Sequence, residues 1–224
     1  MKIQDWPLHE RPREKLLQFG SQTLSDAELL AILINTGIKG QSAIELARNA
    51  INQFGSVQAL LFASQPQLLK LPGLGKAKFA LLQACTELFK RGLAEKLSQQ
   101  DSFTSADTAS DYLRAQLSQQ KREVFAMLML DSQHQLIAYR EMFKGTINSA
   151  AVYPRELVKQ AMDDNAAAVI LAHNHPSGVA EPSQADIQIT QRIKQAFALV
   201  DVTVLDHFVI GHSCAVSFAQ RGLL

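Results

Sequence analysis

The stretch "LAHNHPSGVAEPSQAD", residues 171–186, decides how the second half of the chain folds. It places two histidines directly after an apolar run and then turns the chain sharply. His173 and His175 are one residue apart, so on a strand both imidazoles point to the same face. Pro176 ends the strand, because proline has no N–H to donate to a neighbouring strand. The stretch therefore predicts a strand that ends in a pair of aligned imidazoles.

A helix is expected to follow the turn. Ser183 has the character of an N-cap, and Asp186 then lies on the first helical turn. Two neutral imidazoles and one carboxylate, with a fourth position left open for water, form the ligand set of a catalytic zinc. His-x-His by itself is common, and Ser-x-x-Asp is often a plain helix cap, but the two together in this order are far more specific. We expect Zn²⁺ to be held by His173, His175 and Asp186.

Strands and helices alternate around this stretch. The segments that predict strands are "EVFAMLMLD" (123–131), "LIAYREMF" (136–143), "AAAVILAHNH" (166–175), "VTVLDHFVIG" (202–211) and "CAVSF" (214–218). A helix should open at Tyr153-Pro154, because proline is favoured in the first turn, and a second should run from Ser183 to about Leu199. Short links such as "SQHQ" make part of the sheet antiparallel. Residues 102–224 therefore predict an α/β domain with a mixed sheet.

The first 95 residues read as an all-α domain. Ser25 with Glu28 and Ser42 with Glu45 have capping-box spacing, and apolar residues follow each pair at helical intervals. Further along, "LPGLG" is a tight turn before a helix from Lys76 to Arg91. Residues 92–105 are polar without sustained periodicity and are expected to be a linker. The predicted fold class is α+β with two domains, 1–95 and 102–224.

The charge and the cysteine content narrow the possible partners and the cellular compartment of the protein. The chain has 22 basic and 21 acidic residues, so net charge indicates neither nucleic acid nor membrane. Residues 1–95 carry 11 basic and 8 acidic side chains (+3), and residues 96–224 carry 11 and 13 (−2), a weak pointer to an anionic partner for the first half. Cys85 and Cys214 lie outside any Cys-x-x-Cys pair and fit a reducing compartment. The N-terminus lacks the apolar core of a signal peptide, and the longest apolar run is too short to span a bilayer. We expect a cytoplasmic protein with no membrane contact.

The histidine stretch resembles a known motif. "HNHPSG" followed by Ser183-x-x-Asp186 is similar to the JAMM (MPN+) metalloprotease motif: His-x-His, seven residues, Ser, two residues, Asp. More narrowly, the chain resembles the RadC family of bacterial proteins over essentially its whole length, through "HNHPSG", "KGTINSAAVYPREL", "DHFVIG" and "LPGLGKAK". The resemblance implies a JAMM/MPN-like metallohydrolase domain and, most directly, a zinc metallopeptidase acting on a protein or peptide that the sequence does not identify.

The same resemblance assigns the catalytic groups. It aligns Glu123, at the start of the first strand, with the family's general acid/base, which takes a proton from the attacking water and passes it to the leaving amine. Glu156 in "YPREL" is the rival. Ser183 would donate a hydrogen bond to the oxyanion, a role that can coexist with helix capping. His207 is a possible substitute ligand, although a supporting or packed core position suits it better.

The turn "LPGLGKAK" resembles the hairpin of a helix-hairpin-helix module. There, glycines let backbone N–H groups approach a phosphate at a helix N-terminus, so Gly73, Gly75, Lys76 and Lys78 are candidate DNA contacts. The alternative is an ordinary helix–helix connection with solvated lysines. Two functions beside the peptidase stay open: a DNA-binding recombination or repair accessory protein whose metal is structural or vestigial, and a zinc-dependent nuclease.

Overall fold

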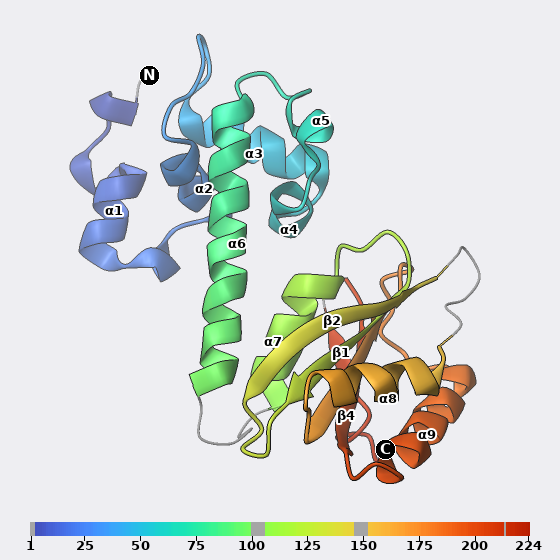
Figure 1. Ribbon diagram of the computed structural model, residues 1–224. Helices are drawn as coiled ribbons and strands as arrows, with labels where there is room; N and C mark the ends of the chain where they lie inside the picture. Colours follow the sequence, from blue (N-terminus) through green and yellow to red (C-terminus); the bar gives the residue numbers. More distant parts are fainter. Residues whose placement is uncertain (1–2, 100–105, 146–151, 213) are drawn as a thin grey trace. The chain divides into compact units, whose positions relative to one another are not determined.

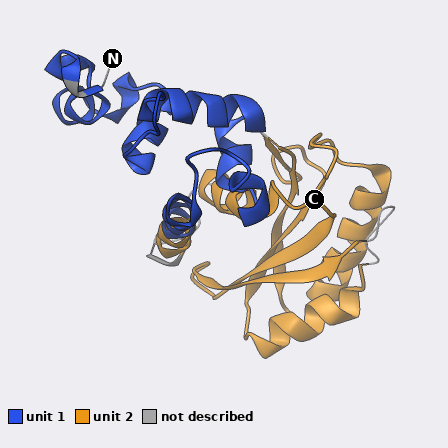
Figure 2. Ribbon diagram, turned by 90° about the horizontal axis from the view of Figure 1, so that it is seen from above, with its two compact units in different colours: residues 1–89 blue, residues 90–224 orange. Residues whose placement is uncertain are grey.

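A computed structural model describes residues 3–99, 106–145, 152–212 and 214–224. The chain divides into two compact units, residues 1–89 and 90–224, which are coloured separately in Figure 2. Each unit has a hydrophobic core of its own. The two are therefore described one at a time.

Unit 1 is built from helices, as the sequence predicts. Its elements are η1 (Ile3–Asp5), η2 (Leu8–Glu10), α1 (Pro12–Phe19), η3 (Ser21–Thr23), α2 (Asp26–Ile34), α3 (Ala43–Phe54), α4 (Val57–Leu61), α5 (Gln65–Leu68) and the first part of α6 (Lys76–Gln99) (Figure 1). Both expected capping boxes form. The Ser25 and Ser42 side chains accept hydrogen bonds from the backbone N–H groups of Glu28 and Glu45, whose carboxylates bind back to the serine N–H groups.

The helix α6 is longer than expected. It runs to Gln99 rather than ending at Arg91, so the first half of the predicted linker is helical. Leu97, 4% exposed, packs in the core of unit 2. An apolar side chain with a tertiary partner outweighed the polar composition of this segment. Residues 100–105, the other part of the predicted linker, lie outside the described residues.

Unit 2 contains a five-stranded mixed sheet in the order β2-β1-β3-β4-β5. The strands are β1 (Val124–Leu130), β2 (Leu136–Lys144), β3 (Ala168–Asn174), β4 (Thr203–Ile210) and β5 (Ala215–Ser217). β3 and β4 are parallel, and the other neighbouring pairs are antiparallel. The expected strands all form, including the hairpin that joins β1 to β2. β3 is the middle strand of the sheet, and its end carries the histidine pair.

Helices cover both faces of this sheet. α7 (Ala106–Leu117) packs on one face against alternate residues of β1, β3 and β4, and α8 (Pro154–Asp163) with α9 (Gln184–Ala198) packs on the other (Figure 1). Every residue of β1 and β3 is buried, as expected for strands between two helical layers. α7 was not anticipated from the sequence. Odd-numbered residues of β3, including His173, face the α8/α9 side.

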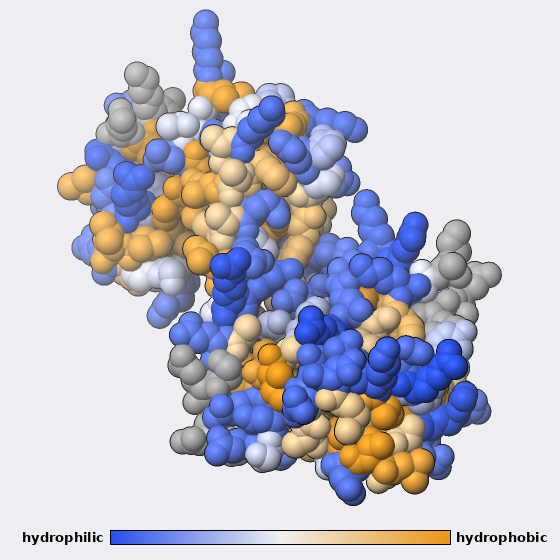
Figure 3. Space-filling model, viewed as in Figure 1, coloured by the Kyte–Doolittle hydropathy of each residue, from blue (hydrophilic) through white to orange (hydrophobic). Residues whose placement is uncertain are grey.

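Apolar side chains also reach the surface of both units (Figure 3). On α6 they include Leu88 and Phe89, 68% and 63% exposed. Scattered exposed apolar residues are normal in folded proteins and carry no function by themselves. No helix within the described ranges combines the length and the apolarity that crossing a bilayer requires.

Asn174, the last residue of β3, holds the entry to β1 in place. Its side chain is 2% exposed and lies on the sheet face opposite to His173. Its Oδ1 accepts a hydrogen bond from the N–H of Val124 at 2.8 Å, and its Nδ2 donates to the carbonyls of Gln120 and Arg122 at 3.2 and 3.1 Å. The side chain thus satisfies three buried or half-buried backbone groups on either side of Glu123.

Removing this amide should destabilise unit 2. Asn174→Ala leaves the Val124 N–H without its partner in the core, and a buried unsatisfied group of this kind costs about 2 kcal/mol, to which the loss of two further bonds adds. Urea unfolding followed by circular dichroism should show a lower midpoint for the unit 2 transition. Gln188→Ala, at an exposed amide on α9, is the control and should change stability by less than about 0.5 kcal/mol. Equal midpoints for the two variants would contradict the assigned role of Asn174.

Candidate metal centre

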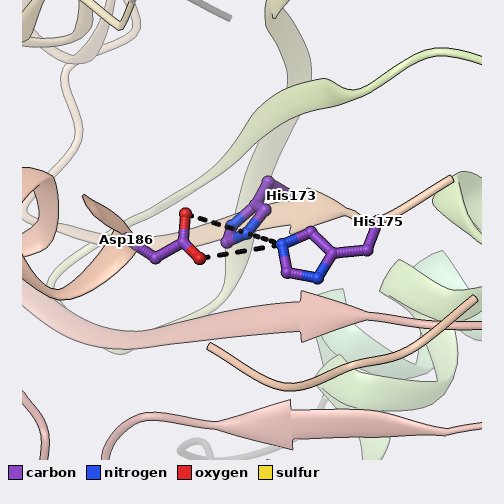
Figure 4. Close-up of side chains that lie close together, drawn as sticks. All are labelled: His173, His175 and Asp186. Carbon is purple, nitrogen blue, oxygen red and sulfur yellow. Dashed lines mark hydrogen bonds and ion pairs between the residues drawn. The ribbon is translucent and has the colours of Figure 1, made fainter. Parts of the chain in front are cut away.

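Three side chains converge beyond the end of β3. His173 and His175 come from β3 and the residue after it, and Asp186 comes from the first turn of α9 (Figure 4). The Nε2 atoms of the two histidines are 3.0 Å apart. The Asp186 carboxylate places Oδ1 3.4 Å from His173 Nε2 and Oδ2 3.7 Å from His175 Nε2. His173 is buried at 1% exposure, and the other two side chains are 22% and 15% exposed, so the group opens to solvent on one side.

This arrangement fits a metal ion. One ligand atom from each residue lies within 4.8 Å of the others, and the ion pairs of all three within the described part of the chain are with one another. Two ligand atoms that each lie about 2.0–2.1 Å from a tetrahedral zinc are about 3.3 Å apart, close to the separations seen here. Two imidazole nitrogens and a carboxylate oxygen are a donor set that zinc accepts. The structure therefore identifies a group able to hold a metal ion, without indicating which metal.

A hydrogen bond at Nδ1, on the side of the ring away from the cluster, fixes the orientation of His175. Its Nδ1 lies 2.9 Å from the carbonyl oxygen of Val179, in the turn that follows Pro176. A carbonyl only accepts, so Nδ1 carries the proton and Nε2 presents its lone pair to the cluster. The nearby Asp186 carboxylate raises the pKa of His175, and the charge of Glu123 adds to this effect against the opposing influence of burial.

His173 is supported by a second buried histidine. Its Nδ1 lies 2.8 Å from Nε2 of His207 on β4, and Nδ1 of His207 lies 2.6 Å from the Thr190 hydroxyl on α9. Both His207 and Thr190 are completely buried. Burial lowers the pKa of His207 well below its usual value, so this ring stays neutral. His207 therefore contacts a candidate ligand and stands outside the group of three.

Asp186 serves the helix cap as well as the cluster. Its Oδ2 accepts hydrogen bonds from the N–H and the hydroxyl of Ser183 at 2.7 and 2.6 Å, and its own N–H donates to Ser183 Oγ at 3.2 Å. Burial by itself would raise the pKa of Asp186, but the neighbouring imidazoles of His173 and His175 and the hydrogen bond from Ser183 outweigh it and hold the pKa well below the usual range. The carboxylate is thus ionised and anchored through one oxygen.

The two candidate acid/base residues lie in different surroundings. Extending the antiparallel register of β1 and β3 two residues beyond the Phe125–His173 pair places Glu123 opposite His175. Glu156 lies in the first turn of α8, binds Arg155 at 3.0 Å and lines a 270 Å³ cavity with Lys159 and other residues. Glu123 therefore lies beside the histidine pair, and Glu156 lines a different cavity.

The glycine turn of unit 1 is not uniformly open. Gly73 has φ +82°, and a Cβ there would meet Ile38 at 2.6 Å, so packing requires this glycine. Gly75 faces open space, and Lys76 is exposed. Lys78 is half-buried and donates to the carbonyl of Thr36 at 2.6 Å, and burial lowers its pKa. The alternative of a plain helix connection assumes that both lysines are solvated, and this does not hold for Lys78, whose ammonium group bonds to the backbone that follows α2.

Two supporting residues escaped the sequence analysis. Asn174 lies within a predicted strand with no role assigned to its side chain, and Thr190 was not singled out. Thr190 lies four residues after Asp186 on the same face of a helix, and this spacing is the one signal that points to it. The partners of Asn174 lie 50 to 54 residues before it, and no local pattern reveals them.

Comparison with known proteins agrees with this architecture. Residues 103–223 match the family model described as RadC-like JAB domain, and residues 3–80 match UPF0758 N-terminal. UPF0758 proteins from Pseudoalteromonas atlantica, Aeromonas hydrophila and Nitrosomonas eutropha are 62%, 58% and 57% identical to this chain, each over all 224 residues and the full length of both chains. The chain belongs to the UPF0758 family of proteins with a RadC-like JAB domain.

Proposed function

We propose that this protein is a zinc-dependent hydrolase that cleaves an amide bond in a protein or peptide. The observation that carries the proposal is the convergence of His173, His175 and Asp186 at the end of β3, with each ligand atom within 4.8 Å of the others. Membership of a RadC-like JAB domain family supports it, since the JAMM motif that the chain resembles is that of metalloproteases. When bound, zinc supplies Lewis acidity, which activates water for attack at neutral pH.

The chain's own residues supply proton transfer and positioning. Glu123 takes the proton of the attacking water and delivers it to the leaving amine nitrogen, a role that suits a carboxylate opposite His175. Asn174 holds the backbone on both sides of Glu123, so this carboxylate starts from a fixed strand end. The proposed acid/base residue thus lies at the start of β1, and the two histidine ligands lie at the end of the neighbouring strand β3.

Before the reaction, the Ser183 hydroxyl is already engaged in a hydrogen bond. Its hydroxyl has one proton, and Asp186 Oδ2 accepts it at 2.6 Å. Ser183 therefore orients the carboxylate before reaction. To donate to the oxyanion of the substrate, the hydroxyl must exchange that hydrogen bond during the reaction, and it can do so because Ser183 is exposed.

Sequence-independent DNA contact by unit 1 is the second candidate function. Gly75 has open space where a side chain would lie, and exposed Lys76 begins α6, so backbone N–H groups there are accessible to a phosphate. This part of the chain would then act as a helix-hairpin-helix-like domain beside the hydrolase domain. A nuclease would require the metal centre itself to act on nucleic acid, so both substrate classes belong in the activity assays.

The first prediction concerns the metal. Purified protein should contain close to one zinc per chain, about the content of a single three-ligand site. His175→Ala should lose most of it, because one of three ligands is gone. Elemental analysis after dialysis is the measurement. His9→Ala, which removes an exposed histidine of unit 1, should keep its zinc. Equal zinc content in all three proteins would exclude the assigned site.

The second prediction separates ligand from catalyst. Glu123→Gln should keep the metal and lose hydrolysis by about 100-fold or more, since it removes the proton acceptor and preserves the shape of the side chain. Wild type and variants are assayed with zinc bound, on a peptide library and on nucleic acids in parallel. Glu156→Gln is the matched control and should stay active. Loss of activity in Glu156→Gln alone would reverse the assignment.

The third prediction concerns DNA. Full-length protein should bind duplexes of unrelated sequence with similar affinity, on the order of 10⁻⁴ to 10⁻⁶ M, and binding should weaken with salt by about 0.9 log units per log unit of salt for each phosphate neutralised. Lys76→Glu should reduce binding, whereas Lys194→Glu on α9 makes the same charge change elsewhere. Fluorescence anisotropy across a salt series measures both. If the Lys76→Glu and Lys194→Glu variants bind DNA equally tightly, the turn does not contact DNA and only connects two helices.

A further inference from the structure

We infer that a buried hydrogen-bond relay from Thr190 through His207 fixes which ring nitrogen of His173 carries the proton, so that Nε2 is kept free to bind metal. The inference rests on the proposed metal site and adds two residues that position a ligand. Thr190 and His207 lie outside the ligand group and act through His173.

The relay starts at a group whose role is fixed. The backbone carbonyl of Asp186 only accepts hydrogen bonds, and Thr190 Oγ1 lies 2.5 Å from it. This is the bond from a helical threonine hydroxyl to the carbonyl four residues earlier. At that separation a proton must lie between the two oxygens, and a hydroxyl has only one. Thr190 Oγ1 therefore has no proton left for its other partner.

That other partner is His207. Its Nδ1 lies 2.6 Å from Thr190 Oγ1, so Nδ1 must donate. The ring is fully buried and packs against Phe218 and Phe125, with centroid separations of 4.7 and 5.5 Å. These apolar surroundings disfavour a charged ring, and a neutral imidazole has one N–H. His207 Nε2 is therefore an acceptor.

The last step reaches the candidate ligand. His173 Nδ1 lies 2.8 Å from His207 Nε2, so it must donate, and Nε2 is the nitrogen of His173 that faces the cluster. His175 reaches the same state through Val179, whose carbonyl oxygen fixes the proton on Nδ1. Two independent devices thus hold a proton on each Nδ1 and turn the two Nε2 atoms, 3.0 Å apart, toward the position that a cation would fill.

The relay also joins two of the three candidate ligands physically. Its first acceptor is the carbonyl of Asp186, the residue whose carboxylate is the third candidate ligand. α9 supplies both Asp186 and Thr190, β4 supplies His207, and β3 supplies His173. A shift of α9 along the sheet would break the relay and move the carboxylate at the same time. The ring state of His173 and the position of Asp186 are therefore coupled.

The first test reads the ring protons directly. ¹⁵N–¹H correlation spectra of the histidine side chains in metal-free, full-length protein at pH 7.5 report which nitrogen is protonated, and His207→Gln identifies the signals of that ring. His207 should be in the Nδ1–H form, which is the minor form of a neutral histidine in water. An Nε2–H or doubly protonated ring would overturn the relay. This measurement does not depend on metal binding or on hydrolysis.

The second test reads the consequence for the metal. Thr190→Val keeps the shape of the side chain and removes the acceptor of His207, so the proton moves to His207 Nε2, which then donates to His173 Nδ1 and leaves the His173 proton on Nε2. Zinc affinity, measured by competition with a chromophoric chelator, should fall by about 10- to 100-fold, as is typical when a partner of a metal ligand is lost. Thr190→Ser restores the hydroxyl and should bind zinc within about threefold of wild type.

The outcomes separate the relay from the proposed function. If wild type binds zinc and Thr190→Val binds it equally tightly, the relay fails and the metal site stands. If wild type has the Nδ1–H form of His207 and binds no zinc, the relay stands and the proposed function fails. If Thr190→Val does not fold, the wild-type ring spectrum and the affinity of Thr190→Ser still decide: an Nε2–H ring, or a Thr190→Ser affinity reduced as far as tenfold, would overturn the inference.

Discussion

The end of β3 must bury two consecutive polar side chains, and much of unit 2 is organised around satisfying them. His173 and Asn174 point to opposite faces of the sheet and are 1% and 2% exposed. Buried polar groups without partners are costly, so each needs a complete set of hydrogen bonds. The Asn174 amide bonds to backbone groups on either side of Glu123, and the His173 ring contacts His207 and the candidate ligand His175. One strand end thus fixes both the start of β1 and the geometry of the candidate site.

Local signals predicted much of this fold. The capping boxes of α2, α3 and α9 are encoded within four residues each, and β1 and β3 are continuous apolar runs, so both kinds of element can be read directly from the sequence. The extension of α6 to Gln99 and the whole of α7 were missed. Their helical state depends on packing against the sheet, as at Leu97 and Leu113, and no local pattern in a polar segment reveals that packing.

The candidate ligands were predictable because the three residues lie close together in the sequence. His173, His175 and Asp186 lie within fourteen residues on one strand–turn–helix unit, so spacing alone brings them together. Their supports come from farther away: His207 is 34 residues from His173, and the groups held by Asn174 are 50 to 54 residues from it. Such contacts follow from the order of strands in the sheet, which the sequence constrains only through their alternation with helices.

The double use of Asp186 has a consequence for how this site changes over evolutionary time. Oδ2 completes the cap of α9 through Ser183, whichever ion is present. A descendant that abandoned metal chemistry would still gain from an aspartate or asparagine here, because the first turn of the helix needs an acceptor. The His175 ring contacts His173 and the Val179 carbonyl, and neither contact belongs to the cap of α9. We therefore expect substitution at 175, rather than at 186, to mark chains in which this site no longer holds a metal.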